Sequence, residues 1–544
     1  MYKKIFIIVT LLLCLFIGCK KKDIKTKKAI DVLDTTSYYT QQDDAVFRIA
    51  GEPEPNTLDP AFMTSKNENK IYSALFEGLV TRSALNNQIE PGLAQKWREN
   101  NNGDQWTFLL RSDAVWSDGT PITADDVVFS WLRVLNPNTH SPNADLLCSL
   151  IRGASTYHYG TDPSLKNDVK IRALDAHTFQ MDLIKPVPYL IDILTKYDFG
   201  IVPSHVIQKY GMQWTHPNTF VSNGPFTLDQ WQKGYYLSCH KSDTYWDSNA
   251  VHLAKVIFSF SQYAQTLYSA YIQGNLDWLS DIPPQFRAKA KEREDYKDTL
   301  LFGTYYYKIN EYSPFLRNHN IRKALSFAIN RDELTSKITN NGEIPAYGIV
   351  APMEGYSVIQ NPFQTNLEGI NKARQLLSQA GYSSTNPLPP LRLIYQESSI
   401  NQAIAENIAS QLKNKLNVTI IPLSLSETDF QKRIYEKNYD LVATSHMGEY
   451  TDPTAMLDLF NTNNFQGYYN NSTYQDLLKK AGGKVYSLSR LKTLEKAEQI
   501  LVNEDCSVIP LYTLSKLELI DTTKWGGWYQ NALGENPMKD IYLK

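Results

Sequence analysis

The residues able to take part in catalysis are scattered along this chain and form no recognised catalytic motif. The sequence has no His-Glu-x-x-His zinc motif, no Gly-x-Ser-x-Gly nucleophile motif and no glycine fingerprint of a dinucleotide site. The run Ala481-Gly482-Gly483-Lys484 lacks the leading glycine spacing and the following Ser or Thr of a phosphate-binding loop. Four carboxylates suit caps, turns and solvated faces better than an acid–base pair: Asp125, Asp126, Asp452 and Asp458. We therefore predict no catalytic residues and a protein that is not an enzyme.

Metal-ligand and disulfide patterns are missing from the sequence as well. The nine histidines show no paired metal-ligand spacing. Three cysteines lie in the body of the chain, Cys148, Cys239 and Cys506, an odd number without Cys-x-x-Cys spacing. We predict no metal site, no cofactor and no disulfide framework, while one disulfide between two of the three cysteines stays open.

The N-terminal segment is predicted to be a targeting signal and not part of the folded domain. Met1–Lys4 is a short basic region, and Ile5–Gly18 is an apolar stretch of 14 residues, too short to cross a bilayer comfortably. Phe16-Ile17-Gly18-Cys19 resembles the lipobox of bacterial lipoproteins. That resemblance implies removal of residues 1–18 and acylation of Cys19, for example with palmitate, which anchors the chain in a lipid bilayer. A plain signal peptide with an incidental cysteine is the alternative.

Composition restricts the class of protein further. The chain has 544 residues, 42% of them hydrophobic and 21% charged, and a formal net charge of −2. These proportions exclude collagen and wholesale disorder, and the nearly balanced charge gives no indication of nucleic acid as a partner. The only long apolar run lies at the N-terminus, which excludes a polytopic membrane protein. Residues 19–45 are predicted to be a flexible polar tether, and the remaining length allows roughly two to four domains.

From Ala45 onward, strand and helix patterns alternate. Alternating short runs predict strands, apolar residues at helical spacing predict helices, and Thr123 followed by Asp126 predicts a helix N-cap. The expected strands are 46–50, 106–110, 392–395 and 418–423, and the expected helices are 127–135, 321–329, 373–380 and about 402–416. This order predicts a mixed α/β protein.

Three stretches together carry a family pattern. They are Glu90-Pro91-Gly92-Leu93 through Trp116-Ser117-Asp118-Gly119 to Phe129-Ser130-Trp131; Ser222-Asn223-Gly224-Pro225-Phe226 with Tyr245-Trp246; and Arg322 to Arg331 with Pro345-Ala346-Tyr347-Gly348, completed by Tyr439-Asp440 to Asp452-Pro453. This pattern resembles the extracytoplasmic peptide-binding proteins of ABC importers, solute-binding family 5, from about Val46 to the C-terminus. Most of these residues suit turns and caps, so they indicate the fold and not ligand contacts.

The resemblance implies an α/β, two-lobe periplasmic-binding-protein fold with an inserted third domain and mixed β-sheets flanked by helices. The expected domain I comprises residues 46–76, 203–302 and 514–544, the inserted domain II residues 77–202, and domain III residues 303–513. Crossovers near 302 and 513 are expected to form a two-strand hinge, which suits rigid-body closure of the lobes.

The resemblance also implies how a ligand is held. In this family an extended peptide pairs through its main chain between the lobes, and an acidic side chain pairs with the α-ammonium group of the peptide. Local matching places the pairing strand on Ala443–Glu449, with Ser445, His446 and Met447 along it and Glu449 as the anchor where oligopeptide-binding members carry Asp. The expected opposing segment is Thr64, Ser65 and Lys66.

Several expected ligand positions depart from the oligopeptide-binding members. Positions with a basic residue, a Trp and a Tyr in those members match Ala443, Glu427 and Asn143 here, and a cystine of some members matches Gly303 and Met447. The scaffold is therefore better indicated than the ligand.

The leading hypothesis is a lipid-anchored, monomeric receptor of the bacterial cell envelope. On the periplasmic or extracellular face it would bind peptides and deliver them to the permease of an ABC transporter. The first alternative keeps the fold but changes the ligand to a nickel chelate, haem or a cell-wall peptide. The second is a surface adhesin or peptide-sensing lipoprotein that needs no transporter, and an enzyme comes last.

Overall fold

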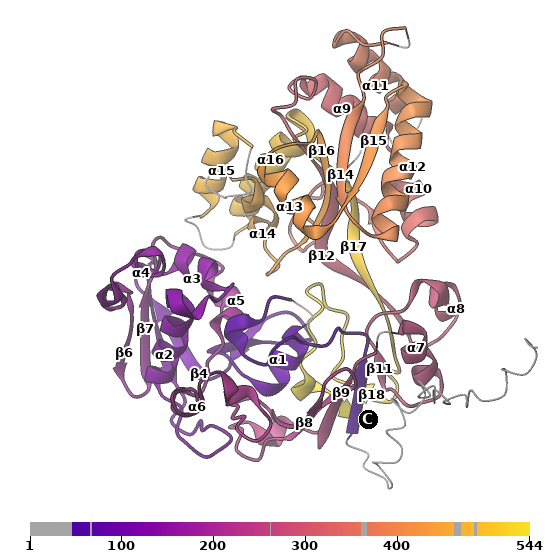
Figure 1. The fold of residues 1–544 in the computed structure, drawn as a ribbon. Coiled ribbons are helices and arrows are strands. Elements are labelled where there is room, and N and C mark those ends of the chain that lie inside the picture. Colours follow the sequence, from indigo (N-terminus) through magenta and orange to yellow (C-terminus); the bar gives the residue numbers. More distant parts are fainter. Residues whose placement is uncertain are drawn as a thin grey trace, which may run out of the picture. The chain divides into compact units, whose positions relative to one another are not determined.

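One mixed β-sheet continues through both lobes of the folded body (Figure 1). The computed structural model describes residues 46–544 except 66–67, 262, 361–366, 384, 462–468 and 483–486, all within the compact unit Asp43–Lys544. The strands follow the order β15 (Ile420–Leu425), β14 (Leu391–Gln396), β16 (Leu441–Met447), β12 (Tyr296–Ile309), β17 (Val508–Ile520), β11 (Trp278–Leu279), β1 (Val46–Ala50), β10 (Lys255–Ser259), β9 (Tyr236–Lys241) and β8 (Phe226–Gln232), and β13 (Ile344–Pro345) pairs with β17.

Two lobes share this sheet. We call the elements before β12, together with residues 521–544 after β17, the first lobe, and the elements between β12 and β17 the second lobe. The first lobe has the helices α1 (Asn69–Leu75), α2 (Ala124–Leu135), α3 (Ala144–Leu150), α4 (Ala154–Tyr159), α5 (Leu190–Ile193), α6 (Ser204–Tyr210), α7 (Ala264–Ile272) and α8 (Arg287–Ala290). The second has α9 (His319–Ala328), α10 (Arg331–Glu333), α11 (Leu367–Gln379), α12 (Ser399–Leu416), α13 (Glu427–Tyr435), α14 (Thr454–Leu457), α15 (Ser472–Gly482) and α16 (Leu488–Gln499).

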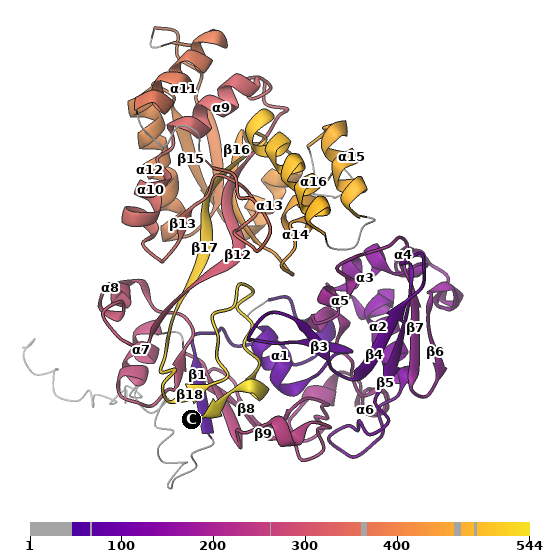
Figure 2. The same cartoon turned by 180° about the vertical axis from the view of Figure 1, so that it is seen from behind.

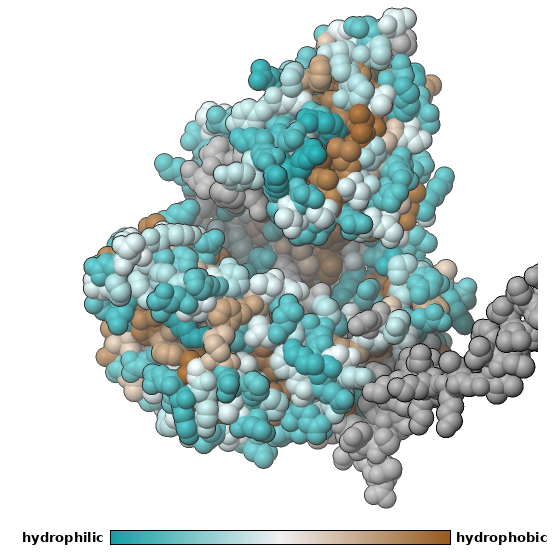
Figure 3. Space-filling view, in the orientation of Figure 1, coloured by the Kyte–Doolittle hydropathy of each residue, from teal (hydrophilic) through white to brown (hydrophobic). Residues whose placement is uncertain are grey.

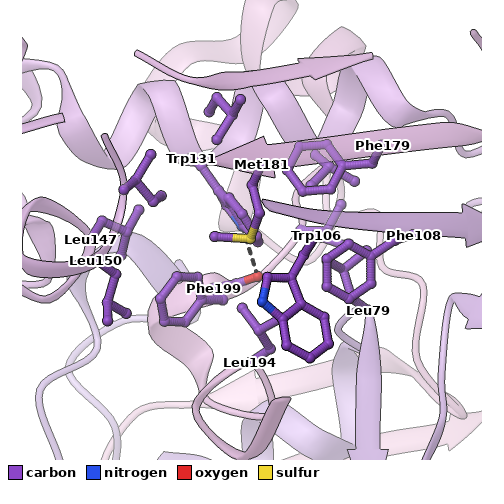
Figure 4. Close-up of a cluster of buried hydrophobic side chains, with 14 of the residues drawn as sticks. Leu79, Trp106, Phe108, Trp131, Leu147, Leu150, Phe179, Met181, Leu194 and Phe199 are labelled. Atoms are coloured by element: carbon purple, nitrogen blue, oxygen red, sulfur yellow. Dashed lines mark hydrogen bonds between the residues drawn. The ribbon is translucent and has the colours of Figure 1, made fainter. Parts of the chain in front are cut away.

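A separate four-stranded antiparallel sheet lies in the first lobe. Its order is β4 (Ala94–Glu99), β5 (Gln105–Leu110), β7 (Thr178–Asp182) and β6 (Ile171–Asp175), and two small pairs join β2 (Val80–Arg82) to β3 (Ile89–Pro91) and β18 (Trp525–Gly526) to β19 (Tyr542–Leu543). A core of its own fills the space between this sheet and α2 to α5 (Figure 4). The ring of Trp131 packs edge-on against Phe179 and Phe199, and its indole N–H donates to the Phe199 carbonyl at 3.1 Å. This part of the lobe therefore has the core of an independent domain.

The second lobe is built by strands buried on both faces. Along β12, Tyr305, Tyr307 and Ile309 join one hydrophobic cluster, while Phe302 and Tyr306 join another. This alternation follows from the opposite directions of successive side chains in a strand. The sheet is thus covered by helices on its two sides, as the alternating α/β pattern predicts.

β12 and β17 are the two long strands that extend from one lobe into the other (Figure 1 and Figure 2). They pair antiparallel from Tyr296↔Leu519 to Leu300↔Ser515, and the pairing resumes at Thr304↔Thr513 after a shift of register. An irregularity of this kind bends a strand pair locally. The bend lies beside Phe302, whose N–H donates to the Ala532 carbonyl at 2.7 Å.

Most predicted elements are confirmed by the structure, with shifted ends. The strand 46–50 is β1, and the helix expected at 127–135 begins at Ala124, where the Asp126 carboxylate accepts from the Thr123 backbone N–H at 3.0 Å. The strand–helix–strand unit is β14–α12–β15, with its last strand beginning two residues later than expected. The helix expected at 373–380 begins earlier, at Leu367.

The surface agrees with the polar composition of the chain. Figure 3 shows polar residues over most of one face, with apolar residues in small groups between them. Among the described residues, no helix is both long enough and apolar enough to span a bilayer.

Candidate functional site

The loop after β16 brings an acidic side chain to the junction of the lobes. The N–H of Gly448 donates to the Phe302 carbonyl at 2.7 Å, so this loop lies against the bend of β12. A Cβ atom at position 448 would lie 2.5 Å from Cδ1 of Phe302, which makes glycine the residue that permits this approach. The next residue is Glu449, the predicted anchor.

Glu449 pairs with a cation from the first lobe. Nζ of Lys196 lies 3.3 Å from Oε2 of Glu449 and 3.1 Å from Oδ2 of Asp198. Burial by itself lowers the pKa of Lys196, but the two neighbouring carboxylates outweigh it and the net pKa is raised. Burial raises the pKa of Asp198, although Lys196 partly offsets this. The ammonium of Lys196 is therefore held charged between the two carboxylates.

A pocket opens at this ion pair and has walls from both lobes. The space between its walls, open solvent included, is about 970 Å³. Gly448 and Glu449 line it from the second lobe, while Lys196 and the α1 residues Tyr72 and Ser73 are among the first-lobe residues that line it. A concave site between lobes, apolar in part and carrying a few convergent charges, is suited to bind a small ligand.

Glu77 supplies a second buried carboxylate to the pocket wall. Its carboxylate accepts hydrogen bonds from the hydroxyl of Tyr245 and from Nε1 of Trp246, the latter at 2.7 Å. Burial raises the pKa of Glu77 to about 7, and these two hydrogen bonds only partly oppose the shift. The side chain of Asn223 brackets the Glu77 backbone, accepting from its N–H at 3.1 Å and donating to its carbonyl at 2.9 Å. The Asn223 and Tyr245-Trp246 motifs therefore position a pocket residue from behind the pocket.

A second contact between the lobes lies beside the first. The rings of Tyr189 and Tyr450 stack with their centroids 4.5 Å apart, and the Tyr189 hydroxyl donates to Oδ2 of Asp458 at 3.4 Å. Behind this stack, Arg490 donates to both carboxylate oxygens of Asp452, at 2.6 and 3.0 Å. Asp452 is thus buried and paired, and its carboxylate also accepts from the backbone N–H of Thr454 at 3.0 Å, which is a turn or cap role that the sequence allowed.

The structure places the other predicted site residues as follows. Ser445, His446 and Met447 lie on β16, opposite Tyr305, Thr304 and Gly303 of β12. The backbone N–H groups of Thr64 and Ser65 both donate to Oε2 of Glu68 at 2.9 Å. Lys66 and Cys19 lie outside the described residues. Of the predicted site residues within the described ranges, Glu449 is the one that lines the pocket.

The positions that depart from the oligopeptide-binding members are also located. Gly303 and Met447 stand directly opposite each other in the β12–β16 pairing. Two cysteines at these positions would be close enough to form a disulfide. The three described cysteines are free and buried. Asn143 donates to the Pro60 carbonyl at 3.0 Å, and Glu427 begins α13.

Two residues of the site gave no signal in the sequence. Lys196 and Asp198 lie at a short 3-10 helix after α5, Tyr197–Phe199, with no motif around them. Only the packing of the first lobe against the loop after β16 identifies them.

Comparisons with known proteins agree with this architecture. The model of the bacterial extracellular solute-binding proteins, family 5, matches residues 88–468. The chain is 30% identical over 501 residues to the periplasmic oligopeptide-binding protein OppA of Escherichia coli K12, with 90% of each chain covered. It is 31% identical over 479 residues to the periplasmic murein peptide-binding protein MppA of the same strain, covering 86% of this chain and 87% of MppA.

Solved structures show the same fold. The periplasmic oligopeptide-binding protein OppAIV of Borrelia burgdorferi superposes with a TM-score of 0.76 at 32% identity, over 92% of this chain and 100% of that one. Proteins of the matched family bind solutes and are not enzymes, which agrees with the prediction of no catalytic role. The chain therefore belongs to the bacterial extracellular solute-binding proteins of family 5.

Proposed function

We propose that this protein binds peptides in the pocket at Glu449 and delivers them to the permease of an ABC transporter. The observation that carries the proposal is the position of Glu449: its carboxylate lines a pocket with walls from both lobes, directly after a strand of the shared sheet. Relatives named for oligopeptide binding, aligned over most of their length, support a peptide as the ligand class.

In the proposed complex the peptide lies extended along β16. Its α-ammonium group pairs with Glu449, and its main chain pairs with Ser445, His446 and Met447. The pairing of β14 with β16 covers Leu441 and Val442, so β16 extends past the end of that ladder toward the pocket. Thr64, Ser65 and Lys66 are proposed to face the peptide from the first lobe. Recognition through the main chain would accept many side chains.

The proposed domains keep the boundaries expected from the sequence, with domain I at 46–76, 203–302 and 514–544, domain II at 77–202 and domain III at 303–513. The shift of register between Leu300↔Ser515 and Thr304↔Thr513 supports a hinge at these crossovers. Two strands bending together would close the lobes as rigid bodies.

The proposed location is the periplasmic or extracellular face of the bacterial cell envelope, with the protein as a monomer. Acylated Cys19 would hold it in the bilayer through the tether of residues 19–45. Labelling cells with a palmitate analogue should mark the wild type and not Cys19→Ser, whereas equal labelling of the two would contradict the anchor. Deletion of the gene should reduce peptide uptake, and unchanged uptake would contradict delivery to a transporter.

A cell-wall peptide is the second candidate ligand. The similarity to the murein peptide-binding protein MppA favours it, since that relative matches at 31% identity. Competition between a murein tripeptide and a mixture of ordinary tripeptides would separate the two candidates.

Calorimetry with one peptide in two forms tests the proposed anchor. Glu449→Gln should weaken a peptide with a free N-terminus by about 1–3 kcal/mol and leave the N-acetylated peptide unchanged. Glu436→Gln, an exposed carboxylate at the end of α13, is the matched control and should change neither. Equal affinity of the wild type for the free and acetylated peptides would contradict the role of Glu449.

A further inference from the structure

We propose that the ammonium of Lys196 is an internal competitor of the ligand, because it occupies the carboxylate that the peptide's α-ammonium is to use. This inference rests on the proposed function and adds a residue that sets the preference for a free N-terminus. It concerns a group from the first lobe, Lys196, acting on an anchor from the second, Glu449.

Geometry places the two ammonium groups in competition. Nζ of Lys196 lies 3.3 Å from Oε2 of Glu449, which is ion-pair distance, and both residues line the pocket. A carboxylate can accept from more than one donor, but a second cation has to approach against the charge of the first. An arriving α-ammonium group therefore shares Glu449 with Lys196 or displaces it.

Asp198 remains as an ion-pair partner for Lys196 after the peptide displaces it from Glu449. Nζ of Lys196 lies 3.1 Å from Oδ2 of Asp198, and the two residues are two positions apart at one short 3-10 helix. Releasing Glu449 thus leaves Lys196 paired, so displacement does not create an isolated buried charge. The exposed fractions agree with a movable contact: 8% for the Asp198 side chain, 17% for Lys196 and 34% for Glu449. The Lys196–Asp198 pair is the sheltered one, and Glu449 is the exposed partner.

Charge balance predicts the consequence for selectivity. Glu449, Asp198 and Lys196 together carry a net charge of −1, so the cluster still attracts one ammonium group. The attraction is weaker than it would be if Lys196 were not paired with Glu449. Lys196 thereby reduces the discrimination between peptides with free and blocked N-termini. A receptor in which a lysine pairs with the anchoring carboxylate releases its ligand more readily than one in which the carboxylate has no such cation.

The test is the ratio of affinities of wild type and variants for one tripeptide with a free and with an acetylated N-terminus, measured by calorimetry. Lys196→Gln alone would leave buried Asp198 unpaired and threaten folding, so the decisive variant is K196Q/D198N, which removes both partners. Its ratio in favour of the free peptide should rise by about tenfold. Lys196→Arg keeps the competing charge and should retain the wild-type ratio.

The outcomes separate this inference from the proposed function. If Glu449→Gln lowers the ratio but K196Q/D198N leaves it at the wild-type value, the competitor role of Lys196 is overturned and the anchor role stands. If neither variant changes the ratio, both are overturned. Arg152→Gln is the charge control, because it removes one cation of the first lobe from an exposed pair with Asp104, and it should leave the ratio unchanged.

Discussion

The ring of Tyr450, from the loop after β16, stacks on the ring of Tyr189 just before α5, with centroids 4.5 Å apart and planes inclined by 12°. Tyr450 follows a strand of the second lobe, yet its side chain belongs to the hydrophobic cluster of the first lobe that contains Trp131 and Phe199. The two lobes are therefore joined by apolar packing in addition to the strands β12 and β17. Tyr450 directly follows Glu449, which lines the pocket between the lobes.

Replacement of Tyr450 by alanine should destabilise the protein by roughly 3 kcal/mol, since it removes a large buried ring and its stacking contact with Tyr189. Urea unfolding at neutral pH would measure the loss. Tyr435→Ala is the control, because this tyrosine on α13 is 72% exposed and should change stability by less than about 0.5 kcal/mol. Similar effects of the two variants would show that the Tyr189–Tyr450 contact contributes no stability.

Arg490→Met should cost about 3–5 kcal/mol of unfolding free energy, because it removes the cation that pairs with the buried Asp452 carboxylate and the two hydrogen bonds from its guanidinium. The exposed pair of Arg152 and Asp104 offers the comparison: Arg152→Met should cost no more than about 1 kcal/mol. Denaturant midpoints of both variants would check the prediction, and equal midpoints would contradict it.

Glu77 should make stability depend on pH near neutrality. Its pKa is raised from 4.5 to about 7 in the folded protein. Between pH 4.5 and 7 the folded state therefore keeps a proton on Glu77 that the unfolded state has released. Stability contributed by this group is therefore complete below pH 4.5 and is lost as the pH rises through 7, by on the order of 3 kcal/mol. Between pH 5 and 8 the unfolding free energy of Glu77→Gln should fall less steeply than that of the wild type, and parallel curves would contradict the prediction.

Cys148, Cys239 and Cys506 should react with a thiol reagent only after unfolding. All three are buried and free, and burial raises their thiol pKa values, to about 11 for Cys148 and Cys506. Counting thiols before and after addition of denaturant would measure this. Rapid labelling of the native protein, or a missing thiol after unfolding, would contradict it.

Much of the fold was predictable because local signals and tertiary packing agree. Thr123 and Asp126 begin α2 as their spacing indicates, and the strand–helix–strand pattern near Arg392 gives β14, α12 and β15. The family motifs also predicted the two-lobe α/β fold, whereas the single sheet shared by both lobes was not predicted. Within these motifs, Asn223 fixes the backbone of Glu77.

The electrostatics of the site could not be predicted from the sequence. Lys196 and Glu449 are far apart in the chain and meet only when the lobes pack, so no spacing or motif connects them. Asp452 holds a turn as its sequence context indicates, but its ion pair with Arg490 could not be predicted, because Arg490 lies on a helix much later in the chain. Long-range ion pairs of this kind depend on tertiary structure and leave no periodic pattern.

Native mass spectrometry of the purified protein, followed by sequencing of what it releases on unfolding, tests the central claim most directly. If nothing is retained, a mixture of di- to octapeptides is added before the measurement. Peptide binding predicts bound species whose masses and fragments are those of short peptides with varied sequences. A single bound compound without peptide bonds, such as a nickel chelate or haem, or no bound peptide after addition of the mixture, would contradict it.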